Sequence, residues 1–246
     1  MLVKADALKG YSLASIDGDI GSADEFYFDD RYWAIRYLVA NTGTWLIGRQ
    51  VLISPYSLDG VNAAEEKVYV LLNKKQIEDS PSIDMDKPVS RQYEGFYNGY
   101  YGLPNYWGGP YMWGDNPHIV RDRSRWGLAA SEAKGWDGHL RSSDEVTGYH
   151  LAALDGEIGH VKDFIVDDET WAIRYLVVAT KNWLPGKKVL ISPKWIESAS
   201  WEENEVAIGL SRAAIKAAPE YHDESLLTRD YETGLYGHYN REGYWV

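Results

Sequence analysis

The heptapeptide Trp33-Ala34-Ile35-Arg36-Tyr37-Leu38-Val39 recurs unchanged at residues 171–177. It is rich in aromatic and β-branched residues, which favour strands. The segment Val51-Leu52-Ile53-Ser54-Pro55 also recurs, at residues 189–193, so both strand-forming segments have a copy 138 positions later in the chain. A repeat at a constant offset indicates that the chain is an internal duplication of one structural unit.

The offset of 138 positions divides the whole chain. Residues 2–107 align with residues 140–245 without a gap, and about 41 of the 106 aligned pairs are identical. We therefore predict a first unit over residues 2–107, a linker over residues 108–139 and a second unit over residues 140–245. A linker of this length is either disordered or packed against the units. Packing is favoured because the linker contains four large rings that are costly to expose to water: Tyr111, Trp113, Trp126 and Trp136.

Tight turns separate short strands within each unit. Asp17-Gly18 and Asp155-Gly156 predict two-residue hairpins, because a type I′ turn needs the positive φ angles that Asp-Gly supplies. Stretches of apolar, aromatic and β-branched residues lie on both sides of these turns. In the first unit they predict strands at residues 11–16, 20–28, 33–39, 51–53 and 68–72.

Closely spaced short strands favour a small closed barrel, because closure removes exposed strand edges. The expected fold is mainly β: two small β-barrels in tandem, each followed by a short helix and an aromatic tail. The helices are expected at residues 74–79 and 211–218. The tails, residues 93–107 and 231–245, are rich in Tyr and Gly, and no regular structure is predicted for them.

The composition excludes several classes of protein. The 246 residues include 25 basic and 37 acidic side chains, so the formal net charge is −12, which opposes binding to nucleic acid or anionic lipid. The absence of cysteine excludes disulfides, thiol nucleophiles and thiolate metal sites. No apolar run reaches the roughly 20 residues of a membrane span, and residues 1–6 lack the apolar region of a signal peptide. A cytoplasmic location without membrane insertion is therefore expected.

The two copies resemble the PRC-barrel domain family, and the chain is similar to tandem PRC-barrel proteins. The resemblance rests on residues 155–164, 171–177 and 186–193, with their counterparts 17–21, 33–39 and 48–55. The family includes the cytoplasmic barrel of the photosynthetic reaction centre H subunit and the C-terminal domain of the bacterial ribosome maturation factor. The resemblance implies a six-stranded barrel, no catalysis and a role in holding partner proteins together. Neither membrane anchoring nor ribosome assembly is carried over, because the H subunit's membrane helix and the maturation factor's N-terminal domain have no counterpart here.

Acidic residues cluster around the first hairpin, at Asp17, Asp19, Asp24 and Glu25. A calcium-binding loop needs oxygen ligands at fixed positions, and the order of these residues lacks the EF-hand spacing. Lys162 replaces Asp24 in the second copy, which would put a cation among the ligands. A solvated turn is therefore favoured over a metal site.

Charged residues also occur in or beside the clearest strand. Asp29-Asp30 and Asp167-Asp168 are adjacent carboxylates, which would point to opposite faces of a strand and commonly accept backbone hydrogen bonds at turns. Arg36 and Arg174 either recognise an anionic ligand or form a structural ion pair or ring contact, and the structural role is favoured. Eight residues are accordingly expected to be structural: Trp33, Arg36, Tyr37, Trp45, Trp171, Arg174, Tyr175 and Trp183.

No catalytic constellation is recognised in the sequence. The six histidines form no H-x-x-x-H pair, so the converging ligands of a zinc site are not expected. The chain also contains no G-x-S-x-G, no phosphate-binding loop and no dinucleotide fingerprint that opens a helix. We therefore expect no enzymatic activity, no catalytic residue, no metal and no cofactor.

The aromatic tails hold the remaining candidates for a partner or ligand surface. These are Tyr97, Tyr100, Tyr101, Tyr106, Trp107, Tyr236, Tyr239, Tyr244 and Trp245. Exposed aromatic clusters bind proteins or sugars, and the alternative is that these rings cover the barrel ends or join the two copies. The predicted function is a non-enzymatic adaptor or scaffold that binds a partner protein through its barrels, like the reaction centre H subunit at the level of fold. The alternative is a small-molecule or carbohydrate binding module that uses the tails. A homodimer and an intramolecular pseudo-dimer of barrels both stay open.

Overall fold

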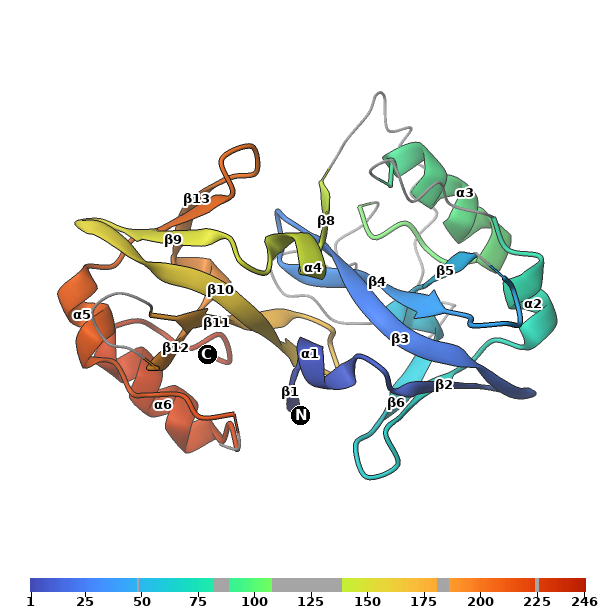
Figure 1. Ribbon diagram of the computed structural model, residues 1–246, viewed down its shortest axis with the longest axis horizontal. Helices are drawn as coiled ribbons and strands as arrows, with labels where there is room; N and C mark the ends of the chain where they lie inside the picture. Colours follow the sequence, from blue (N-terminus) through green and yellow to red (C-terminus); the bar gives the residue numbers. More distant parts are fainter. Residues whose placement is uncertain (48, 82–88, 108–138, 181–185, 224–225) are drawn as a thin grey trace. The chain divides into compact units, whose positions relative to one another are not determined.

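The computed structural model describes residues 1–47, 49–81, 89–107, 139–180, 186–223 and 226–246 (Figure 1). The expected linker, apart from His139, and the candidate Trp183 lie outside the described residues. Contacts divide the chain into two compact units. Unit 1 comprises Met1, residues 3–144 and residues 166–173, and unit 2 comprises Leu2, residues 145–165 and residues 174–246.

A mixed β-sheet forms the centre of unit 1. Its strands lie in the order β5-β4-β3-β2-β7-β6, and β8 pairs with β3. The bounds are β2 Ser12–Ser15, β3 Gly18–Asp29, β4 Ala34–Asn41, β5 Gln50–Ile53, β6 Leu58–Asn62, β7 Lys67–Val70 and β8 Leu140–Ser142. Neighbouring strands are antiparallel except β2 and β7, which are parallel.

A second mixed sheet has the same strand order, β12-β11-β10-β9-β14-β13, and β1 pairs with β10. The bounds are β1 Leu2–Lys4, β9 His150–Ala153, β10 Gly156–Asp167, β11 Ile173–Ala179, β12 Lys188–Ile191, β13 Ile196–Ser200 and β14 Glu205–Ile208. The parallel pair of β9 and β14 matches that of β2 and β7. The duplicated sequence therefore folds twice into one strand order, and the prediction of a mainly β fold is confirmed.

No closed barrel is detected within the described residues, and the sheet-rich architecture fits the expected fold. β5 and β6 are the two ends of the first strand order, and β12 and β13 are those of the second. The chain leaves β5 and β12 through 3-10 turns, Pro55–Ser57 and Pro193–Trp195. Because proline has no amide hydrogen, these turns end the strands instead of extending their ladders.

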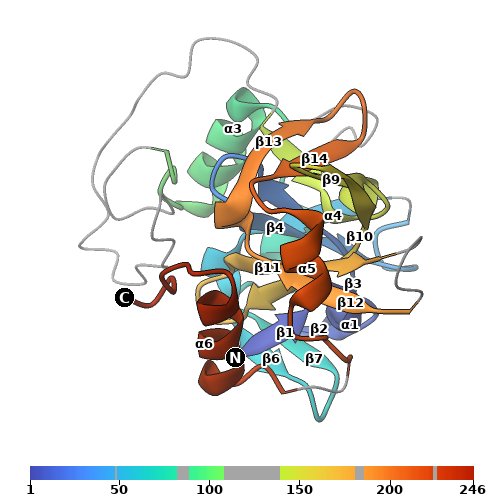
Figure 2. The ribbon, with the colours of Figure 1, turned by 90° about the vertical axis from the view of Figure 1, so that its left-hand side faces the viewer.

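Short helices follow the strands where the sequence predicts them, as α2 (Lys74–Glu78) and α5 (Arg212–Ala217). Single helical turns, α1 (Ala5–Leu8) and α4 (Ser143–Val146), precede β2 and β9. The prediction of irregular tails was wrong, because α3 (Arg91–Tyr101) and α6 (Arg229–His238) are regular helices. Figure 2 shows α6 near α5, where the His238 ring nitrogen lies 2.8 Å from the carbonyl oxygen of Ala214.

Capping side chains begin the two tail helices. Ser90 accepts a hydrogen bond from the backbone amide of Tyr93 at 3.1 Å, and Thr228 accepts one from that of Tyr231 at 3.3 Å. The frequent glycines were the reason that no helix was predicted in the tails. One of them is Gly99, where an added Cβ atom would meet open space. The glycine therefore lies away from the packed face, where it lowers helix propensity without disturbing any contact.

Trp33 and Trp171 are buried residues with left-handed backbone, at φ 52° and 58°. Each therefore ends a turn, and β4 and β11 start after it instead of including it as predicted. Both belong to unit 1, where the amide of Ile35 donates to the carbonyl of Trp171 and the amide of Ile173 donates to that of Trp33, each at 2.8 Å. These bonds offset the cost of an uncommon conformation for a bulky side chain.

We predict that Gly21→Ala strongly destabilises unit 1. Gly21 has φ +119°, and a Cβ atom there would overlap the carbonyl oxygen of Asn41 on β4. The expected loss in the free energy of unfolding is about 3 kcal/mol, since both strain and a backbone clash contribute. Urea denaturation measures it. Gly99→Ala is the control, because it adds a methyl group in open space within α3 and should be neutral or stabilising; equal losses in both variants would contradict the prediction.

Candidate functional site

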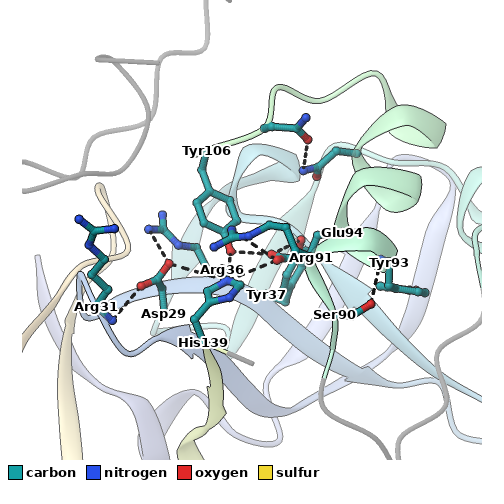
Figure 3. Close-up of polar contacts among 12 residues, drawn as sticks. Asp29, Arg31, Arg36, Tyr37, Ser90, Arg91, Tyr93, Glu94, Tyr106 and His139 are labelled. Atoms are coloured by element: carbon teal, nitrogen blue, oxygen red, sulfur yellow. Dashed lines mark hydrogen bonds and ion pairs between the residues drawn. The ribbon is translucent and has the colours of Figure 1, made fainter. Parts of the chain in front are cut away.

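A buried carboxylate, that of Glu94 on α3, lies at the centre of a polar cluster in unit 1 (Figure 3). The hydroxyl groups of Tyr37 on β4 and Tyr106 in the tail donate to its Oε1 atom at 3.1 and 2.6 Å. Arg91, one helical turn earlier, places its guanidinium 3.5 Å from Oε2. A buried carboxylate requires such hydrogen bonds and positive charge to offset its lost hydration.

Arg36 extends the cluster through the interior of the sheet. Its side chain is fully buried, and its Nη2 atom lies 3.4 Å from Oδ2 of Asp29 at the end of β3. The guanidinium also lies over the ring of Tyr106, 3.9 Å from the ring centre. Asp29 in turn accepts hydrogen bonds from the backbone amides of Arg31 and Tyr32, as expected for an aspartate at a turn. Arg36 therefore has an ion pair with Asp29 and a ring contact with Tyr106.

His139 completes the cluster from the residue before β8. Its Nε2 atom lies 2.7 Å from the hydroxyl oxygen of Tyr106 and 3.3 Å from Oε2 of Glu94, with Oδ2 of Asp29 at 4.0 Å. The backbone amide of Asp30 donates to the carbonyl of His139 at 2.9 Å. Figure 3 shows His139, Glu94 and Tyr106 converging from three separate segments of the chain.

Unit 2 repeats the carboxylate arrangement at Glu232 on α6, which is also buried. Tyr175 and Tyr244 donate to its Oε1 atom at 2.7 and 2.9 Å, and Arg229 lies 3.0 Å from Oε2. Arg174 lies over the ring of Tyr244 at 4.1 Å, as Arg36 does over Tyr106. In both copies a carboxylate on the tail helix holds a strand tyrosine and a tail tyrosine.

The tyrosines around these carboxylates are permanent hydrogen-bond donors. Burial, and then the negative charge of Glu94, raises the pKa of Tyr37 and Tyr106 well above 10.0. Burial and the hydrogen bond to Glu232 likewise raise the pKa of Tyr244 to about 12. Because their hydroxyl groups stay protonated at physiological pH, the arrangement anchors the tail on the sheet.

Most of the predicted tail candidates lie inside the protein. Tyr97, Tyr106, Tyr236 and Tyr239 are buried, so they present little surface to a partner. Tyr101, Trp107, Tyr244 and Trp245 are half-buried, and Tyr100 is exposed. The reason is that a tyrosine can bury its ring and still satisfy its hydroxyl group, as Tyr97 does by donating to the carbonyl of Leu52 at 3.0 Å.

The residues predicted to be structural occupy interior positions, with two exceptions among those described. Arg174 and Trp45 are half-buried, and the ammonium group of Lys74 lies 5.7 Å from the Trp45 ring centre. The remaining described residues are buried: Trp33, Arg36, Tyr37, Trp171 and Tyr175.

The acidic hairpin residues have partners within the protein. Asp17 accepts a hydrogen bond from the backbone amide of Lys74 at 2.8 Å, and Asp155 accepts one from that of Arg212 at 2.7 Å. Each aspartate therefore fastens its hairpin to the start of α2 or α5. Asp24 accepts from the Gln50 amide group at 3.2 Å. Among the described residues no group of three or more His, Cys, Asp or Glu side chains is arranged to hold a metal ion.

Sequence reasoning missed three members of the cluster: Glu94, Arg91 and His139. Glu94 and Arg91 recur at Glu232 and Arg229, and a charged pair kept within an otherwise aromatic segment was the available signal. His139 has no such signal, because it lies at the end of the expected linker and reaches Glu94 only through the fold.

Residues 152–212, from β9 to the start of α5, match a family model. They form a PRC-barrel domain. The PRC-barrel match lies in the second copy, and the first copy is related to it through the duplication. A comparison with curated proteins found no match. In the described parts of the chain, no helix has both the length and the apolar character needed to cross a membrane.

We predict that Glu94→Gln lowers the free energy of unfolding by about 3 kcal/mol, because it leaves the buried Arg91 without its charged partner. Glu232→Gln should cost less in unit 2, because its charged partner Arg229 is 51% exposed. Tyr106→Phe, which removes one hydroxyl group, should cost about 1 kcal/mol. Urea denaturation followed by circular dichroism measures these changes.

The control is Glu65→Gln, since Glu65 forms an exposed ion pair with Lys67 at 3.0 Å and such pairs contribute about 0.5 kcal/mol or less. A Glu94→Gln protein as stable as this control would contradict a central role for the carboxylate.

Proposed function

We propose that this protein is a non-enzymatic adaptor that binds a partner protein through the hairpin tips of its two copies. A PRC-barrel domain suggests a protein-interaction module in general. The observation that carries the proposal is an exposed aliphatic residue at the same place in each copy. Ile16 is 69% exposed and Leu154 is 66% exposed, and they are 138 positions apart.

The backbone amide of each residue forms a hydrogen bond to a neighbouring segment. The amide of Ile16 donates to the carbonyl of Leu72 at 3.1 Å, and that of Leu154 donates to the carbonyl of Leu210 at 3.0 Å. A single exposed aliphatic residue is ordinary on a protein surface. Among the large apolar side chains exposed in the described residues, however, this is the single pair that recurs at the offset of the duplication. Its recurrence favours a contact that both copies make.

The surface is larger in unit 1. β2 and β7 pair in parallel with Ala14 opposite Tyr69, and Leu71 follows directly after β7. Leu71 and Tyr69 are 45% and 39% exposed. Their counterparts in the second copy are Gly209 and Ala207, so the first copy offers more apolar contact area and should bind more tightly.

The proposed partner is a protein, because a net charge of −12 opposes binding to nucleic acid. The analogy with the reaction centre H subunit supports an accessory role at the level of fold. The proposal keeps the cytoplasmic location expected from the sequence, which cell fractionation tests. No observation favours the small-molecule alternative, since the tail rings on which it depends are largely engaged with the sheets.

The partner is identified by placing a photo-crosslinking amino acid at position 16 or 154 of the full chain. The control places it at Ala64, an exposed turn residue. The expected result is one protein crosslinked from positions 16 and 154 and not from position 64. With that partner purified, Ile16→Asp combined with Leu154→Asp should weaken binding at least about tenfold.

Circular dichroism verifies that the double variant folds. Ile16→Asp alone should weaken binding more than Leu154→Asp alone, since unit 1 has the larger surface. A folded double variant that binds the partner as tightly as the unchanged protein would overturn the proposal.

A further inference from the structure

The buried cluster of unit 1 contains one group that changes charge near neutral pH, and it is His139. Its side chain is 8% exposed, although histidine is commonly a surface residue. The residues that follow it form β8, in which Leu140 pairs with Asp29 and Ser142 pairs with Tyr27 on β3. The imidazole thus lies at the point where the chain joins the edge of β3.

Charged and titratable groups face His139 from every element packed against it. They are Asp29 and Asp30 at the end of β3, Arg36 and Tyr37 on β4, Arg91 and Glu94 on α3, Tyr106 in the tail and Arg141 on β8. The arginines pair with carboxylates, since Arg36 contacts Asp29, Arg91 contacts Glu94 and Arg141 contacts Asp30. The carboxylate nearest to the imidazole is Glu94 at 3.3 Å.

We propose that His139 is a pH-dependent latch. As an imidazolium it fastens β8 to the buried carboxylate of Glu94, and as a neutral imidazole it loosens that attachment. Tyr106 donates to Glu94, so its hydroxyl oxygen accepts from Nε2 of His139. The Nε2 hydrogen remains when the ring loses its other proton, so deprotonation keeps this hydrogen bond and removes the ionic attraction.

The direction of the pH dependence follows from the surroundings of the imidazole. Burial and the positive charge of Arg91 favour the neutral ring, but the hydrogen bond to Glu94 and the charges of Glu94 and Asp29 outweigh them and raise the pKa of His139 above 6.5. A group whose pKa is raised on folding contributes stability that is complete below its unfolded pKa. That stability is lost as the pH rises through the folded value. The latch therefore holds below pH 6.5 and loosens as the pH rises through the raised pKa of His139.

Unit 2 provides an internal comparison. Glu232 accepts from two tyrosines and pairs with Arg229, and within the described residues its contacts include no histidine. Arginine stays charged throughout the relevant pH range. The attachment of α6 through Glu232 should therefore be independent of pH between about 6 and 8.5, whereas His238 contacts Ala214 separately at the other end of the helix.

The test is hydrogen exchange of backbone amides in the full chain without a partner, between pH 6 and 8.5, after correction for intrinsic exchange rates. The amide of Asp30, which donates to the carbonyl of His139, and the amides of β8 report the attachment. We expect their protection to fall by about threefold or more as the pH rises, while that of the α6 amides around Glu232 stays constant. In His139→Gln, which keeps a side-chain donor and has no charge to lose, the β8 protection should not change with pH.

A second measurement guards against a variant that fails to fold. The imidazole resonances of His139 in the unchanged protein should titrate above 6.5. The latch is refuted if β8 protection has the same pH dependence in His139→Gln and the unchanged protein, or if His139 titrates at or below 6.5. Both measurements use the chain alone, so their outcome does not depend on the adaptor function.

Discussion

A carboxylate removed from water must be supplied with hydrogen bonds and positive charge, and Glu94 obtains them from separate parts of the chain. Tyr37 comes from the centre of the sheet, Arg91 from the same helix and Tyr106 from the segment after it. Because leaving such a group unsatisfied costs several kcal/mol, helix, strand and tail must pack together. Glu232 imposes the same constraint on the second copy.

The aromatic composition follows from this constraint. The chain has 19 tyrosines and only 4 phenylalanines, and a tyrosine can bury its ring while its hydroxyl group serves a polar partner. Tyr37, Tyr106 and Tyr175 use this property at the carboxylates, and Tyr97 uses it at a strand carbonyl. The tails are therefore mainly structural, and the recurring apolar surface lies at the hairpin tips.

The two copies share a fold and differ in what they add to it. The first copy has the larger exposed apolar surface, through Leu71 and Tyr69, and a histidine beside its buried carboxylate. In the second copy these surface positions are Gly209 and Ala207. A duplicated scaffold can keep one set of packing contacts while one copy acquires binding area and sensitivity to pH. The residues that are identical at the offset of 138 positions identify the packing contacts on which the shared fold depends.

The sequence by itself determined the duplication, the strands around residues 33–39 and 51–53, the Asp-Gly hairpins and the short helices, because each depends on neighbouring residues and their intrinsic preferences. Only the tertiary structure decided that the tails are helical and packed, that Trp33 ends a turn, and in which order the strands pair. It also decided that His139 meets Glu94. These outcomes depend on groups such as Tyr37 and Glu94, which are 57 residues apart in the chain. Local patterns carry no information about which distant partner will satisfy a buried polar group.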